Sequence, residues 1–242
     1  MSIKSKVLAT AATLTLVGGV AAAGALTSGT AHAATPSAGF SAVDLFNHEF
    51  GHTSLLDVYK RGTAIGTPII LFQASNEDPA EDFTVFEEGL VGDFFKAGLV
   101  SAAFNLHYSN DVAVELQYSP YGVGTGECVG TAVTAVQGAK VSLQPCGVSS
   151  KTVWAVDTND PNFVIHGLKV ALANGSTTNF SFPQVMTYPQ DANPVDRPRA
   201  QVDTEQITGF FGQIPSSTPG VGIPTGPPID RQLWSAFFGP VH

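Results

Sequence analysis

Short apolar blocks separated by glycine-containing turns recur along this chain. Within the blocks, apolar and polar residues often alternate, which is typical of half-buried β-strands because successive side chains of a strand point to opposite faces. Residues 42–85 and 113–156 carry the same succession of blocks at an offset of 71–73 residues. The matching blocks are AVDL and AVEL, SLLDV and ECVGT, GTPIILFQA and GAKVSLQPC, and DFTV and VWAV. The pattern predicts an internal repeat with four strands in each copy.

A third, less regular copy is predicted over residues 163–204. Its segment FPQVMTYPQ, at 182–190, is similar to the third strand of the second copy at an offset of 44 residues. This alignment places one set of third-strand residues on one face of the strands, namely Ile69, Leu71, Val141, Leu143, Val185 and Thr187. It places Phe72, Gln144 and Tyr188 on the opposite face. Because one copy cannot close a core alone, we expect twelve strands around a pseudo-threefold axis.

The first copy resembles a repeat of the ricin-type β-trefoil lectins, and the likeness covers about residues 40–204. That family reads, approximately, N-x-x-S-G-x-x-L-D-V, then G-x-x-V-x-L-W-x-C, then N-Q-x-W. This chain has Leu56-Asp57-Val58, then Gly66 through Phe72, then Ala80-Glu81-Asp82-Phe83 at the corresponding places. The resemblance implies an all-β fold, a β-trefoil of three imperfect repeats. Because no catalytic motif stands out in the sequence, we expect no enzymatic activity and no cofactor.

The same resemblance implies a carbohydrate site in the first copy, formed by Asp57, Phe72 and Glu81. In ricin-type lectins the aspartate accepts hydrogen bonds from sugar hydroxyls, and an outward aromatic ring stacks on the apolar face of the sugar. The second copy has Gly130 and Gln144 instead, and the third has Tyr188 without a recognisable aspartate, so neither is expected to bind. The alternatives are that Asp57 caps a turn and that Phe72 packs under the insertion or the C-terminal tail.

The first 33 residues have the features of a secretory signal peptide. Lys4 and Lys6 precede an apolar, alanine-rich run that ends in a small-residue cleavage pattern, Ala31-His32-Ala33. A single-pass anchor is the competing interpretation, which the cleavage pattern disfavours. No other segment is long and apolar enough to span a bilayer, so we expect a secreted, extracellular protein without membrane insertion after cleavage.

Charge and cysteine content narrow the possible functions. With 11 Lys and Arg against 20 Asp and Glu, the net charge is −9, so nucleic acid and anionic membranes are poor candidates as partners. Cys128 and Cys146 are the two cysteines, and in an oxidising compartment we expect them to form a disulfide. In the ricin-type alignment, they also fall where that family closes a disulfide within a repeat.

One motif favours a different function. His48-Glu49-Phe50-Gly51-His52 matches the H-E-x-x-H signature of zinc proteases, which requires both histidines on one face of a helix. In the repeat alignment this segment instead covers the end of a strand and a turn, so no metal is expected and zinc hydrolysis is a remote alternative. The acidic segment NEDPAED at 76–82 is interpreted as a solvated loop, with calcium binding as its alternative.

Two further segments remain outside the repeats. An insertion at about 86–112 contains DFFKAGLVSAAF, which fits either a short helix or an extra hairpin. Residues 34–204 are assigned to the trefoil domain, and residues 205–242, which include Trp234, to a Pro/Gly-rich extension that packs on the domain or binds a partner. The predicted function is a secreted carbohydrate-binding module. The main alternative is a scaffold that binds another extracellular protein through the insertion and the extension.

Overall fold

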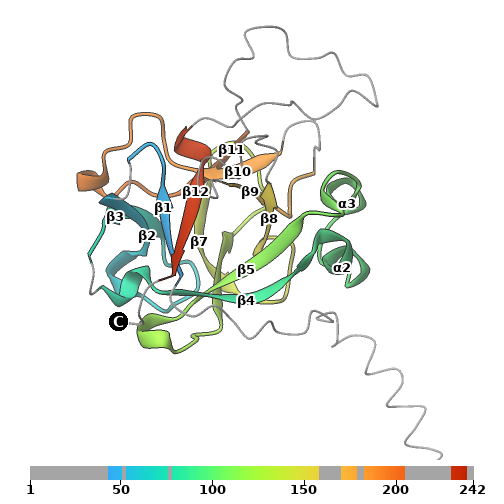
Figure 1. Cartoon of the computed structure of the whole chain (residues 1–242), viewed down its shortest axis with the longest axis horizontal. Coiled ribbons are helices and arrows are strands. Elements are labelled where there is room, and N and C mark those ends of the chain that lie inside the picture. Colours follow the sequence, from blue (N-terminus) through green and yellow to red (C-terminus); the bar gives the residue numbers. More distant parts are fainter. Residues whose placement is uncertain are drawn as a thin grey trace, which may run out of the picture.

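The computed structural model describes residues 43–50, 53–75, 78–157, 170–178, 183–204 and 230–238, and its strands follow one another in three groups of four (Figure 1). The first group is β1 (Val43–Asn47), β2 (Ser54–Val58), β3 (Ile69–Gln73) and β4 (Phe83–Leu90). The second is β5 (Val112–Tyr118), β6 (Glu127–Thr131), β7 (Ala139–Pro145) and β8 (Val153–Asp157). The third is β9 (Ala171–Asn174), β10 (Gln184–Thr187), β11 (Gln201–Thr204) and β12 (Trp234–Phe238). The predicted signal peptide and His52 lie outside the described residues.

Six of the strands close a barrel. Strand β1 pairs with β4, β4 with β5, β5 with β8, and β8 with β9, and β12 pairs with β1, all antiparallel. The remaining gap, between β9 and β12, is bridged next to the start of β9, where the main chains of Val170 and Trp234 exchange two hydrogen bonds of 2.9 Å. The first and fourth strands of each group therefore form a ring without an open edge.

The other six strands form three hairpins, β2–β3, β6–β7 and β10–β11. Their third strands also bond to one another: the amide of Leu143 donates to Thr67, that of Val141 to Ala200, and that of Ala200 to Ile69, each at 2.9 Å. Three hairpins that meet in this way over a six-stranded barrel define a β-trefoil. The predicted all-β trefoil is thus confirmed by the strand pairing.

The third copy is built differently from the predicted one. Met186 of β10 lies opposite Val202 of β11, as Val129 lies opposite Leu143 in the second copy. Residues 184–187 are therefore the second strand of their copy, not the third, and the alignment of 182–190 with 138–146 is wrong. Because a shift of one residue turns every side chain to the other face, Tyr188 is also misplaced: it is fully buried, with its ring centroid 5.5 Å from that of Trp234.

The fourth strand of the third copy comes from the C-terminal segment. A 3₁₀ turn, η6 (Asp230–Gln232), leads into β12, which lies beside β1 in Figure 1. Gln232 and Trp234 have the Q-x-W spacing of the ricin-type repeat, and both side chains are fully buried. The trefoil therefore extends beyond residue 204, and the hypothesis that Trp234 lies on a free partner-binding arm is wrong. Residues 205–229 and 239–242 lie outside the described part of the chain.

The interior of the barrel is closed by one aromatic residue from each fourth strand, Phe83, Trp154 and Trp234, all fully buried. They pack with the inward residues of the hairpins, among them Ile69, Leu71, Val141 and Leu143, as the strand pattern predicts. Burying three large aromatic side chains supplies much of the apolar area that stabilises such a fold.

The insertion forms two short helices, α2 (Val91–Lys96) and α3 (Ala102–Tyr108), on the outside of the barrel (Figure 1). Phe94 and Phe104 are buried there against a separate cluster that includes four alanines, Ala113, Ala155, Ala171 and Ala173. These small residues let the helices approach the strands closely. In the described part of the chain, no helix has the length and apolar character needed to cross a bilayer.

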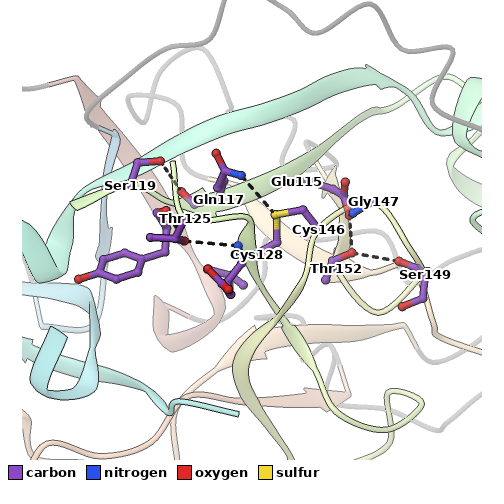
Figure 2. Close-up of a disulfide and its surroundings, with 12 residues drawn as sticks. Glu115, Gln117, Ser119, Thr125, Cys128, Cys146, Gly147, Ser149 and Thr152 are labelled. Atoms are coloured by element: carbon purple, nitrogen blue, oxygen red, sulfur yellow. Dashed lines mark hydrogen bonds between the residues drawn. A yellow bond between two sulfur atoms is a disulfide. The ribbon is translucent and has the colours of Figure 1, made fainter. Parts of the chain in front are cut away.

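The predicted disulfide is present between Cys128 of β6 and Cys146, directly after β7, with 4.9 Å between their Cα atoms. Figure 2 shows the turn that follows it being held by a buried carboxylate: Glu115 accepts from the amide of Gly147 at 3.1 Å and from the hydroxyl of Thr152. The disulfide thus attaches the start of the 146–152 turn to β6, and the carboxylate of Glu115 attaches the turn to β5.

Candidate functional site

A pocket of about 170 Å³ opens beside the first hairpin. It is lined by Asp57, Lys60, Arg61, Ile70, Phe72, Asp78, Ala80 and Arg197. Asp57 and Phe72, two of the three residues predicted for the carbohydrate site, thus line one pocket, on the paired strands β2 and β3. The volume is below the 300–1,000 Å³ or so of pockets for drug-sized ligands, so the pocket suits a single small ring or group.

Asp57 forms part of the pocket floor. It lies within β2, opposite Ile70, and its side chain is only 4% exposed, so the interpretation of Asp57 as a turn residue is wrong. The pKa of its carboxyl group is raised to about 7, mainly by burial and also by the negative charge of Asp78, against smaller opposing effects of Arg197 and Arg61. Near neutral pH this group can therefore either donate or accept a hydrogen bond.

Phe72 forms part of the wall and is half-buried. The guanidinium carbon of Arg197 lies 4.3 Å from the centroid of its ring, a cation–π contact. Arg197 itself is exposed and belongs to the third copy. One face of the predicted stacking platform is consequently in contact with an exposed, charged side chain rather than with the core.

Glu81, the third predicted residue, is not among the residues that line the pocket. It is 1% exposed, and its two carboxylate oxygens accept from the amide of Ser75 at 3.1 and 3.3 Å. Burial raises the pKa of Glu81 to about 8 in spite of this hydrogen bond. Its described contacts fix the loop that carries Asp78, so Glu81 supports the pocket rather than facing it.

The charged residues at the rim of the pocket were not predicted from the sequence. Asp78 accepts from the side chain of Arg61 at 2.9 Å and from the amide of Ala80 at 2.9 Å. Lys60, Arg61 and Arg197 add three positive charges. A correct register for β11 would have indicated Arg197. With that register, Val202 corresponds to Leu71 and Leu143 of the other copies. Arg197 stands five residues before Val202, and Gly66 and Gly138 stand five residues before the two leucines. Lys60 and Arg61 give no comparable signal.

The zinc-protease motif begins in the turn after β1, so the prediction of a non-helical segment is confirmed for His48, Glu49 and Phe50. The Nε2 atom of His48 lies 2.6 Å from the hydroxyl oxygen of Ser235 on β12, and Glu49 is exposed. Over the described ranges, no three His, Cys, Asp or Glu side chains gather closely enough to hold a metal ion.

No protein-family model matches this chain, and no curated protein is detectably similar in sequence. Among solved structures, the designed threefold-symmetric protein ThreeFoil is similar, with 13% identity over 80% of this chain and 96% of that chain and a TM-score of 0.47. The agglutinin of Rhizoctonia solani has 16% identity over 82% and 95% of the two chains, with a TM-score of 0.46. The agglutinin of Abrus precatorius has 13% identity over 80% of this chain but only 47% of its own, with a TM-score of 0.43. The trefoil assignment rests on the strand pairing described above.

Proposed function

We propose that this protein is a secreted, non-catalytic module that binds carbohydrate in the pocket of the first copy. The observation that carries the proposal is that Asp57 and Phe72, which the resemblance to ricin-type lectins singled out, line the same pocket. A carboxyl group and an aromatic ring suit a sugar, which presents hydroxyls on its edge and apolar C–H groups on its faces. The disulfide supports secretion, since disulfides persist in oxidising compartments.

The affinity for a single sugar should be low. A small, shallow site of this kind is expected to bind a monosaccharide with a dissociation constant on the order of 1 mM, near −4 kcal/mol. Useful binding would then require clustered glycans or several copies of the protein, which raise the effective concentration.

The test is a glycan array followed by titration of the best ligand into the full chain. Asp57→Asn keeps the shape of the buried side chain but changes its hydrogen-bonding capacity, and Phe72→Ala removes the stacking face; each should weaken binding at least about fivefold, roughly 1 kcal/mol. Gln144→Ala is the matched control, because Gln144 occupies the place of Phe72 in the second copy. Unchanged binding by both pocket variants would show that the site lies elsewhere.

The alternative of a protein-binding scaffold loses the support of three aromatic residues that are buried, whereas Phe95 of α2 is 39% exposed. Phe94 and Phe104 of the insertion pack against the barrel, and Trp234 fills its interior. If no sugar on the array binds, binding of an extracellular protein partner becomes the favoured function.

A further inference from the structure

The pocket concentrates positive charge on an acidic protein. The chain has 11 Lys and Arg against 20 Asp and Glu, yet three of its cationic side chains, Lys60, Arg61 and Arg197, line this one pocket. Asp57 and Asp78 also line the pocket, so its cations outnumber its acidic side chains by three to two, and an excess of one sign of charge raises the local concentration of ligands of the opposite sign. The three cationic side chains therefore indicate the charge of the ligand, which Asp57 and Phe72 alone do not.

The main chain is strained at the same three residues. Lys60, Arg61 and Arg197 have φ values of 55°, 56° and 52°, and the fourth non-glycine residue with positive φ in the described ranges, Tyr121, does not line the pocket. The left-handed conformation is unfavourable for residues with a side chain, and such strain tends to cluster where side chains act on ligands. Gly66 and Gly138, the counterparts of Arg197, have φ values of 86° and 77°. Arg197 thus stands at a left-handed position where the other two copies have glycine, the residue that adopts this conformation readily.

The charges of the pocket do not cancel. Arg61 is paired with Asp78 at 2.9 Å. Over the described ranges, neither Lys60 nor Arg197 forms an ion pair with a carboxylate; both lie over aromatic rings, Lys60 at 5.1 Å from the centroid of Tyr59 and Arg197 at 4.3 Å from that of Phe72. Since Asp57 is largely protonated below neutral pH, the pocket then carries an excess of positive charge.

We propose that the pocket selects sugars that carry an anionic substituent, with Arg197 as the residue that binds the anion and Phe72 as the surface for the sugar ring. This inference rests on the proposed carbohydrate function and adds the ligand class. A guanidinium group binds carboxylate or sulfate through paired hydrogen bonds. Because Arg197 is exposed, its guanidinium can turn from the ring of Phe72 toward the anion while the sugar occupies the ring face. Lys60, at the same rim, adds a second positive charge.

Matched sugars test the inference on the full chain at pH 6 and low salt. Galactose is compared with galacturonic acid, and glucose with glucuronic acid, by NMR titration, so that each pair differs at C6 alone. The acidic sugar of at least one pair should bind about tenfold more tightly than its neutral partner, and the preference should shrink with added salt because exposed charges are screened. Galactose 6-sulfate identifies the source of the charge: equally tight binding indicates a site for any anionic sugar, and weak binding indicates a carboxylate site.

Arg197→Gly is the decisive variant, because it installs the residue that the other copies have at this left-handed position and should leave the fold intact. It should reduce the preference for acidic sugars to about twofold or less while neutral sugars still bind. Arg197→Gln, which keeps a polar side chain without the charge, provides a second variant should the first fail to fold. Lys96→Gln is the matched control: it removes one charge from α2, away from the residues that line the pocket, and should keep the preference.

Failure of this inference and failure of the proposed function give different results. If neutral sugars bind as tightly as acidic ones, or if both Arg197 variants retain the full preference, the assignment of the ligand class to Arg197 is overturned while the carbohydrate site stands. If neither neutral nor acidic sugars bind, both proposals are overturned together.

Discussion

The indole nitrogen of Trp234 donates a hydrogen bond of 3.0 Å to the main-chain carbonyl of Met186. In the second copy, the indole nitrogen of Trp154 donates in the same way to Val129, at 2.8 Å. Met186 and Val129 are corresponding residues of their second strands, as their pairing with Val202 and Leu143 shows. The two tryptophans thus make the same contact between the fourth and second strands of two copies, although one of them arrives from the far end of the chain.

This relationship predicts how Trp234 can be replaced. Trp234→Ala should lower the free energy of unfolding by about 3–5 kcal/mol, because it removes a large, fully buried ring. Trp234→Phe should cost less, since the first copy already accommodates Phe83 at this place; loss of the bond to Met186 accounts for about 1–3 kcal/mol of that cost. Urea unfolding measures both. Trp154→Phe provides the comparison, and a much smaller effect at Trp234 would show that β12 contributes little to the barrel.

Gly130 explains why the second copy has no aspartate at the place of Asp57. A Cβ atom on Gly130 would lie 2.7 Å from the carbonyl oxygen of Lys151 and 2.9 Å from a methyl carbon of Thr152. We expect Gly130→Ala to destabilise the protein by about 1–3 kcal/mol, because main-chain atoms would have to shift. Gly130→Asp should be at least as costly and should create no second sugar site. Thermal unfolding and sugar titration of these variants test both statements, and a stable Gly130→Asp protein with doubled binding stoichiometry would contradict them.

The disulfide should contribute substantially to stability. By the chain-entropy model, a cross-link over a separation of 18 residues stabilises the native state by about 3 kcal/mol. Reductant should therefore lower the midpoint of urea unfolding of the wild-type protein. It should leave the Cys128→Ala/Cys146→Ala variant unaffected, because the chain has no other cysteine. Detection of two free thiols in the unfolded, unreduced protein would instead show that the bond does not form.

The sequence predicted the first two copies well because their strands keep a regular spacing and a clear inward pattern. Ile69, Leu71, Val141 and Leu143 reach the core as expected, and Asp57 and Phe72 reach one pocket. The third copy was misassigned because residues 205–229 separate β11 from β12, which hid the link between Trp234 and its repeat. A short apolar strand such as β10 also fits two registers, and only its partner β11 decides between them.

The residues at the rim of the pocket were not predicted from the sequence for a different reason. Asp57 and Phe72 belong to strands whose positions repeat, whereas Lys60, Arg61 and Asp78 lie in connections that have no counterpart in the motif. Arg197 of the third copy contacts Phe72 of the first, where the segment that leads into β11 bonds to β3. A correct register for β11 would have indicated Arg197, but its contact with Phe72 follows only from the assembled fold, since no local pattern links residues so far apart in the chain.

Two buried acids make the stability of the protein depend on pH. The pKa of Asp57 is raised from 3.8 to about 7 and that of Glu81 from 4.5 to about 8, in both residues mainly by burial. Between the unfolded and the folded pKa values, the native state holds protons that the unfolded state has lost, so the free energy of unfolding falls as the pH rises. This contribution is fully present below about pH 4 and is lost by about pH 8. The groups whose charges act on Asp57 are Asp78, Arg197 and Arg61, and those that act on Glu81 are Asp57, Asp44 and Asp78.

We therefore expect Asp57→Asn/Glu81→Gln to flatten the fall in stability that the wild-type protein shows between pH 5 and pH 8. Both replacements keep the size of the side chain, and Glu81→Gln keeps an oxygen acceptor for the amide of Ser75, so the variant should fold. Urea unfolding at several pH values gives the two profiles. Asp93→Asn is the control: its exposed carboxyl group is paired with Lys96, which lowers its pKa, so its removal should leave the slope between pH 5 and pH 8 unchanged. Parallel profiles for the wild type and the double variant would mean that neither buried acid retains its proton near neutral pH. Asp57 would then be ionised, and the excess of positive charge in the pocket would be smaller than the arrangement of Lys60 and Arg197 suggests.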